Sequence, residues 1–396
     1  MNKVFDILTD IAQREAKRLM HSKELTVGLL SGDMGSIVFL YEYSQIDKSF
    51  LAIADEMLER LLKSLRQRHH ISTYCSGIAG MAVGLHELHR KGYIDLDFHA
   101  LTDFDRYIAA MQSFMLSNNQ HDFLHGFIGL GFYWAMRLRQ GENSISTVQL
   151  ARLVDYLART SEFDRGAARW LLPPGKLTKP YNISISHGCS STIILLCDLL
   201  ELPQMQEHHP IIRRLAGGGA DYLLRNQISP EQYGCWFAST SLDCERAHRG
   251  RLAWCYGDLG VCVALARAGQ VLADSSLTAL SKQVLEYSAS HRRGIAENQV
   301  RDACVCHGAA GVGVVFREMA EHFGSPVLAD AASYWRDVVC QMAVYECDGV
   351  TFPYYDAVSH RLAHRTAILE GDVGVAMFLI GENRPSSLGT FLLINR

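Results

Sequence analysis

The chain alternates between two kinds of apolar stretch. In the first kind, apolar residues recur at i, i+3, i+4 and i+7 and charged residues occupy the other side, as in LAIADEMLERLLKSL over residues 51–65. This spacing predicts amphipathic helices that bury one face. Six further segments share it, over residues 5–20, 104–116, 147–160, 211–227, 277–293 and 327–346.

Stretches of the second kind are apolar on nearly all sides, and each follows a Gly-x-x-Gly motif. A helix that is apolar all round belongs in the interior of a protein. A seventh, degenerate copy begins at Gly188 and has Ser191 in place of its second glycine. The complete copies begin at Gly32, Gly77, Gly126, Gly257, Gly308 and Gly371. Successive first glycines are 45, 49, 62, 69, 51 and 63 residues apart, so one unit recurs seven times with loops of variable length.

The simplest closed arrangement of these helices is an all-α fold, an α/α toroid of seven inner and seven outer helices. Strand-like alternation is confined to short pieces such as YNISIS, residues 181–186. The repeats absorb the whole chain, so we expect one domain over residues 1–396. If the inner helices run parallel, all seven motifs gather at one end of the ring. The longest loops, 162–185 and 228–253, lead into that end and are expected to form a substrate-binding rim.

Charge and composition narrow the classes of function. Thirty-eight basic against 42 acidic residues give a net charge of −4, which argues against a nucleic-acid partner. No apolar run approaches the roughly 20 residues that span a bilayer, and the start of the chain lacks a signal peptide's apolar stretch. We therefore expect a cytoplasmic protein without a transmembrane segment. Eleven cysteines, an odd number, favour free thiols over a disulfide framework.

Two thiols and one imidazole come just before the motif glycines of adjacent repeats: Cys255, Cys306 and His307. Such a set suits zinc and leaves a fourth tetrahedral position for water or substrate. Cys304 lies two residues from Cys306 and could replace it, and Cys189 is a further alternative ligand. The remaining thiols singled out are expected to be core residues: Cys75, Cys197, Cys262 and Cys340.

Three ordered motifs resemble those of the lanthionine synthetase C-like family, and the resemblance covers nearly the whole chain: Ser186-His187-Gly188, Trp254-Cys255-Tyr256-Gly257 and Cys306-His307-Gly308. The resemblance implies an α/α toroid with one zinc ion per chain. The implied activity is that of a stand-alone lanthipeptide cyclase in antibiotic biosynthesis, which adds peptide cysteine thiols to dehydroalanine or dehydrobutyrine and closes (methyl)lanthionine thioether rings.

The same resemblance implies partners and catalytic roles. The substrate would be a dehydrated precursor peptide with leader and core, and a separate dehydratase and an exporter are expected partners in a complex at the membrane periphery. His187 matches the family's acid/base residue. Asp122, in Asp122-Phe-Leu-His-Gly126, would orient His187 or handle the thiol proton. Arg251 and Tyr256 match flanking positions that could stabilise enolate charge or hold the substrate.

Two alternatives stay open. One is an enzyme that adds glutathione or another soluble thiol to dehydroamino acids, and the other is a non-catalytic zinc-containing scaffold that binds peptides. A toroidal glycosidase or terpenoid cyclase would need paired acidic residues or an aspartate-rich Mg²⁺ motif. The sequence has no DDxxD-type run, which argues against that class.

Overall fold

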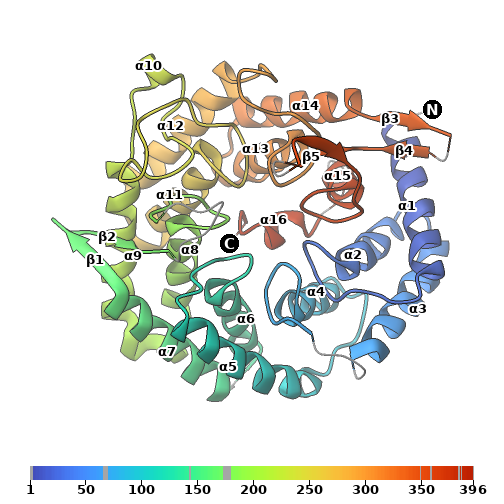
Figure 1. Cartoon of the computed structure of the whole chain (residues 1–396), viewed down its shortest axis with the longest axis horizontal. Helices are drawn as coiled ribbons and strands as arrows, with labels where there is room; N and C mark the ends of the chain where they lie inside the picture. The colour runs from blue at the N-terminus through green and yellow to red at the C-terminus, as the bar shows by residue number, and fades with distance from the viewer. Residues whose placement is uncertain are drawn as a thin grey trace.

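The computed structural model describes residues 3–65, 70–141, 144–172, 180–347, 349–356, 359–381, 384 and 386–395. In these residues, long helices form two concentric rings (Figure 1). The inner helices are α2 (Asp33–Tyr43), α4 (Ile78–Arg90), α6 (Phe127–Arg139), α8 (Cys189–Leu200), α11 (Asp258–Leu272), α13 (Ala309–Phe323) and α15 (Asp372–Ile380). The outer helices are α1 (Lys3–His21), α3 (Ser49–Ser64), α5 (Thr102–Ser117), α7 (Ser144–Thr160), α9 (His209–Arg225), α12 (Ser275–His291) and α14 (Pro326–Gln341).

Each inner helix contacts the next one along the chain, and α15 contacts α2, so the inner ring is closed. The predicted all-α toroid with seven inner and seven outer helices is therefore confirmed. None of the helices in the described residues combines the length and the hydropathy that a membrane span requires.

Short helices and hairpins lie in the segments that connect the long helices. Four are short helices: η2 (Phe98–Leu101), η3 (Pro203–His208), α10 (Pro230–Tyr233) and α16 (Leu388–Phe391). Three antiparallel hairpins pair β1 (Ser161–Asp164) with β2 (Ala167–Trp170), β3 (Val344–Glu346) with β4 (Gly349–Thr351), and β5 (Tyr354–Asp356) with β6 (Arg361–Ala363).

Two segments differ from the sequence pattern. The amphipathic helix expected over 327–346 ends at Gln341, and its last residues form β3. The alternating segment 181–186 forms no strand. Its polar groups are used locally, because Asn182 Oδ1 accepts a hydrogen bond from Ser184 N–H at 2.8 Å and the Ser186 hydroxyl donates to the carbonyl of Cys255 at 3.2 Å.

The first glycine of every motif immediately precedes an inner helix. In the second repeat, the N–H of Ile78, the first helical residue, donates to the carbonyl of Ile71 at 3.0 Å. The loop thus folds back over the glycine, where a side chain would meet that carbonyl. Gly257 also has φ +83°, a conformation that L side chains rarely adopt.

The second glycine lets the loop carbonyl of its own repeat approach the helix. A Cβ atom on Gly260 would lie 2.5 Å from the carbonyl oxygen of Trp254 and 2.7 Å from the side chain of Ile185. In the degenerate repeat, Ser191 instead turns its hydroxyl onto the carbonyl of Gly188, at 3.0 Å.

A ring of hydrogen bonds joins the motif loops to one another. Its members are the residues two positions before each first glycine, and we call them the loop ring: Leu30, Cys75, Leu124, Ser186, Cys255, Cys306 and Leu369. Five backbone N–H to carbonyl bonds of 2.9 to 3.3 Å link neighbouring members, and they include the bond from Leu369 to Leu30 that joins the last repeat to the first. All seven motif loops therefore gather at one end of the toroid, which we call the motif end.

Ion pairs tie three inner helices to the structure around them, and the aspartate of each pair is buried. Repeats one, five and seven carry an aspartate after the first glycine, and these pair with Arg18, Arg292 and Arg14 at 2.7 to 2.9 Å. Both side chains of the Asp258–Arg292 pair are inaccessible to solvent. Asp258 also accepts hydrogen bonds from the N–H groups of Trp236 and Phe237, which anchors loop 228–253.

The C-terminal segment lies in the middle of the ring (Figure 1). Phe391 and Leu392 are buried, and their carbonyls accept hydrogen bonds from the Tyr74 hydroxyl at 3.3 Å and from Trp254 Nε1 at 2.9 Å. Tyr74 and Trp254 each precede a member of the loop ring, so the segment supports the motif end from inside.

We expect Gly260→Ala to destabilise the protein by about 1–3 kcal/mol, because the new methyl group would overpack against Trp254 and Ile185. The matched control is Gly217→Ala within α9, where an added Cβ meets nothing within 4 Å. That control should be neutral or stabilising by about 0.5–1 kcal/mol. Thermal unfolding midpoints check both, and equal midpoints for the two variants would contradict the close approach at the motif.

Candidate functional site

Three consecutive positions of each motif loop have different environments. The residues three positions before the first glycine are fully buried in the centre of the ring: Leu29, Tyr74, Phe123, Ile185, Trp254, Val305 and Ile368. The next residues form the loop ring. The residues directly before the glycine all keep some exposure, and we call them the mouth residues: Ser31, Ser76, His125, His187, Tyr256, His307 and Glu370. Side-chain chemistry at the motif end is therefore set by the loop ring and the mouth residues.

Cys255, Cys306 and His307 lie together at this end. Cys255 and Cys306 are neighbours in the loop ring, where the N–H of Cys255 donates to the carbonyl of Cys306 at 3.3 Å, and their thiols also interact by a hydrogen bond. Cys306, His307 and Glu370 each place one possible ligand atom within 4.8 Å of the other two. Cys255 comes from the fifth repeat, Cys306 and His307 from the sixth, and Glu370 from the seventh. Glu370 was not expected from the sequence.

His307 is oriented by groups behind it. Its Nε2 lies 3.3 Å from Oδ2 of Asp302 and 3.2 Å from the carbonyl oxygen of Tyr355, and its ring also makes a hydrogen bond with the thiol of Cys304. Metal-bound histidines usually donate their second N–H to a carboxylate or a carbonyl in this way. Asp302 is fixed in turn by the N–H groups of Cys304 and Tyr355, at 2.9 and 2.7 Å.

The two alternative ligands have different positions. Cys304 forms a second possible ligand group with Asp302 and His307, within the same 4.8 Å limit. Cys304 is 2% exposed, and burial raises the pKa of its thiol to about 11. Cys189 directs its Sγ toward the carbonyl of Gly219 in α9, at 3.9 Å, and burial raises the pKa of this thiol well above its usual range. Cys189 thus faces an outer helix, whereas Cys304 lies behind His307.

Cys255 is the thiol of the adjacent pair that ionises first. Burial acts to raise its pKa, but the hydrogen bond from Cys306 and the positive charges of His307 and Arg251 outweigh burial and lower the pKa. The same hydrogen bond with Cys255, followed by burial and the charge of Cys255, raises the pKa of Cys306. The thiolate is the form of cysteine that binds metals.

His187 and Asp122 form a pair across two repeats. His187 Nδ1 lies 2.5 Å from Asp122 Oδ2, and the second carboxylate oxygen accepts from the N–H of His125 at 2.8 Å. Burial acts to lower the pKa of His187, but the hydrogen bond and negative charge of Asp122 outweigh it and raise that pKa. The imidazolium form of His187 therefore persists to higher pH than that of a free histidine.

Tyr256 and Arg251 flank this pair and the thiols. The ring centroid of Tyr256 lies 6.1 Å from that of His187, and burial followed by the charge of Cys255 raises the pKa of the tyrosine. Its hydroxyl consequently stays protonated and can donate a hydrogen bond. Arg251 is half-buried, and its positive charge acts to lower the pKa of Cys255. Its guanidinium makes no hydrogen bond within the described ranges.

The two loops expected to form a rim contact each other. Residues 173–179 of the loop 162–185 lie outside the described residues. In the rest of that loop, Arg169 pairs with Asp243 of the loop 228–253 at 2.7 Å, and the N–H of Tyr181 donates to Cys244 Sγ at 3.3 Å. The β5–β6 hairpin also reaches the motif end, because the carbonyl of Tyr355 contacts His307. This third segment was not expected from the sequence.

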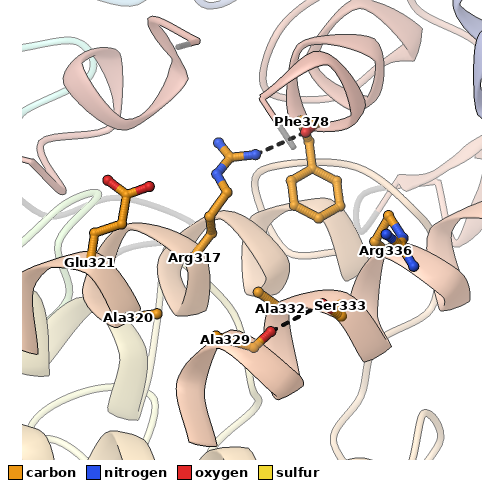
Figure 2. A pocket seen from close by; sticks show the side chains of 8 residues that line it. All are labelled: Arg317, Ala320, Glu321, Ala329, Ala332, Ser333, Arg336 and Phe378. Carbon is orange, nitrogen blue, oxygen red and sulfur yellow. Dashed lines mark hydrogen bonds between the residues drawn. The ribbon is translucent and has the colours of Figure 1, made fainter. Parts of the chain in front are cut away.

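A separate cavity of about 240 Å³ lies between α13, α14 and α15 (Figure 2). It is lined by the later turns of α13 and α15, where Arg317 Nη1 donates to the carbonyl of Phe378 at 2.9 Å. Because both helices begin at the motif end, this cavity belongs to their opposite half. None of the predicted site residues lines it.

We expect Asp122→Asn to lower the pKa of His187, because the amide removes the negative charge that favours the imidazolium. The pKa can be measured by NMR titration of the histidine ring protons, with His187→Gln identifying the resonance. His322, in the last turn of α13, is the internal control, since the shift of its pKa comes from burial and the charge of Arg267. An unchanged His187 titration in Asp122→Asn would contradict the pairing.

Comparison with known proteins agrees with this architecture. None of the curated proteins is similar enough in sequence to match. Among solved structures, the chain is similar to nisin cyclase, with a TM-score of 0.75 and 15% sequence identity over 98% of this chain and 96% of that one. The family model of the lanthionine synthetase C-like proteins matches residues 23–390. This match, together with the motifs and the toroid of the chain, shows that the chain belongs to the lanthionine synthetase C-like family.

Proposed function

We propose that the protein is a zinc-dependent lanthipeptide cyclase. It would add cysteine thiols of a dehydrated precursor peptide, with leader and core, to dehydroalanine or dehydrobutyrine in the same peptide. The observation that carries the proposal is that Cys306 and His307 place ligand atoms within 4.8 Å of each other, with Cys255 hydrogen-bonded to Cys306 and close enough to His187 for their charges to interact. Membership of the family supports it. The proposal includes a cytoplasmic location, with a separate dehydratase and an exporter as partners.

The residues at the motif end fit a zinc ion. Two thiols, one of them with a lowered pKa, and an imidazole held through its Nε2 form a soft donor set that suits zinc. Cys255, Cys306 and His307 would hold one ion per chain. When bound, zinc supplies a Lewis acid that keeps a substrate thiol deprotonated at neutral pH.

His187 supplies the proton that completes the addition. The peptide sulfur forms a bond to Cβ of the dehydroamino acid, and the electrons of the C=C bond move toward Cα and its carbonyl as an enolate. His187 then donates a proton to Cα. The charge of Asp122 keeps the imidazolium available, and its 2.5 Å hydrogen bond to Nδ1 leaves Nε2 as the donor.

Arg251 and Tyr256 would bind the developing enolate. The guanidinium of Arg251 makes no hydrogen bond in the described residues, and the Tyr256 hydroxyl stays protonated, so both can donate to an oxyanion. Such donors are most effective where protein excludes water from the developing charge. Both residues interact with Cys255: the charge of Arg251 acts to lower the pKa of the Cys255 thiol, and the charge of Cys255 acts to raise the pKa of Tyr256.

Metal analysis tests the ligand set. We expect about one zinc ion per wild-type chain, loss of zinc in Cys255→Ala and in Cys306→Ala, and retention in Cys262→Ala, the matched buried thiol outside the motif end. Elemental analysis of the purified proteins measures this. Zinc that survives both ligand substitutions would refute the site, and loss in Cys304→Ala with retention in Cys306→Ala would transfer the ligand role to Cys304.

Replacing His187 tests the chemistry. We expect His187→Ala to slow cyclisation by about 10²–10⁴-fold while zinc is retained, because the proton donor is lost and the ligands remain. In the wild type, the rate should fall as the pH rises through the raised pKa of His187. The assay uses a synthetic peptide with one cysteine and one dehydroalanine; mass spectrometry after thiol alkylation detects the ring as a loss of alkylatable thiol.

The same assay separates the alternatives. A mass increase equal to added glutathione, with the peptide's own cysteine still alkylatable, would show addition of a soluble thiol. Peptide binding with no chemical change in either wild type or His187→Ala would show a non-catalytic scaffold.

A further inference from the structure

Glu370 is the mouth residue of the seventh repeat, and the mechanism above leaves it unused. Its side chain is 31% exposed, and a carboxylate oxygen lies within 4.8 Å of the ligand atoms of both Cys306 and His307. Cys255, Cys306 and Glu370 come from three consecutive repeats of the ring. The sixth repeat, which carries Cys306, thus lies between the repeats that carry Cys255 and Glu370.

One of the two carboxylate oxygens of Glu370 is fixed by a hydrogen bond. Arg365 Nη1 donates to Oε2 at 2.9 Å, while Oε1 has no hydrogen-bond partner in the part of the chain that the structure describes. Arg365 is itself fixed, because its carbonyl accepts from the N–H of Asp372 at 3.2 Å and its guanidinium lies over the ring of Tyr354, 5.2 Å from the centroid. A carboxylate with one oriented oxygen and one free oxygen is typical of a supported metal ligand.

We propose that Glu370 is a fourth, displaceable ligand of the metal ion held by Cys255, Cys306 and His307. This inference rests on the proposed zinc site. The three residues leave one tetrahedral position open, and a carboxylate oxygen of Glu370 lies within 4.8 Å of the ligand atoms of Cys306 and His307. A thiolate is a softer donor than a carboxylate, so a substrate thiolate can take this position. The substrate thiol gives its proton to water as its sulfur binds the metal, and the displaced carboxylate of Glu370 stays paired with Arg365.

A displaceable carboxylate has a consequence for selectivity. Any thiol that reaches the metal must compete with a ligand attached to the protein, so a free small thiol binds less readily than it would at an open site. A cysteine presented by a bound peptide has the advantage of a high effective concentration and can still compete. Glu370 would thus favour the intramolecular reaction over capture of soluble thiols.

Metal affinity gives the first test, on the full chain. We expect Glu370→Gln to weaken zinc binding by about tenfold or more in competition with a chelating dye. The matched control is Glu321→Gln, an exposed carboxylate on the later turns of α13, which should bind zinc as the wild type does. Glu370→Asp provides a second variant in case glutamine disturbs folding, and it should also bind zinc more weakly, because its carboxylate is one methylene shorter.

Thiol binding gives the second test. Protein loaded with cobalt(II) is titrated with 2-mercaptoethanol, and the sulfur-to-cobalt charge-transfer absorption reports the thiol ligand. We expect Glu370→Gln to reach half-saturation at about tenfold lower thiol concentration than the wild type, because no carboxylate competes. Unchanged zinc affinity or unchanged thiol dependence in Glu370→Gln would overturn the role of Glu370.

The two failures can be told apart. If Cys255→Ala and Cys306→Ala lose zinc while Glu370→Gln behaves as wild type in both tests, only the inference about Glu370 fails. If the two cysteine variants keep their zinc, the proposed metal site fails and the inference fails with it.

Discussion

The ring of backbone hydrogen bonds between the motif loops is the constraint on which the rest of the structure depends. Each bond is worth about 1 kcal/mol, but together they fix the relative heights of helices that are distant in sequence. Leu369 and Leu30 are joined in this way at opposite ends of the chain. In each motif loop, the residue before the loop-ring member is then buried in the core, and the residue after it is a mouth residue with some exposure. The environment of a side chain thus follows from its position in the motif.

The fourth repeat is the exception to this ring, and it carries His187. Within the described residues, no backbone hydrogen bond joins Leu124 to Ser186, and Ser186 reaches Cys255 only through its hydroxyl. Side-chain hydrogen bonds link the third and fourth repeats instead, between Asp122 and His187 at 2.5 Å and between His121 and Thr192 at 2.8 Å. Side chains thus make here the connection that backbone atoms make elsewhere, and the pair of Asp122 and His187 is titratable.

Periodicity was sufficient to predict the fold, because helical spacing and the Gly-x-x-Gly motif are both local. The inner helices begin at the glycines as expected, since a side chain there would meet the preceding loop. The gathering of Cys255, Cys306 and His307 also followed from the repeat. Asp302 and Glu370 could not be found in this way. Asp302 acts through a side-chain contact within its own loop, and Glu370 becomes a neighbour of Cys306 only when the seventh repeat packs beside the sixth. The hairpin that brings Tyr355 to His307 has too few residues for a readable alternation.

The C-terminal segment occupies the middle of the ring, where a central channel would otherwise run. Phe391 and Leu392 are buried there, and their carbonyls are hydrogen-bonded to Tyr74 and Trp254. For the proposed peptide substrate, this segment blocks a path through the centre of the toroid. A proposed substrate with several reactive residues would therefore reach and leave the motif end from the same side, with one entry and one release for each ring that is closed.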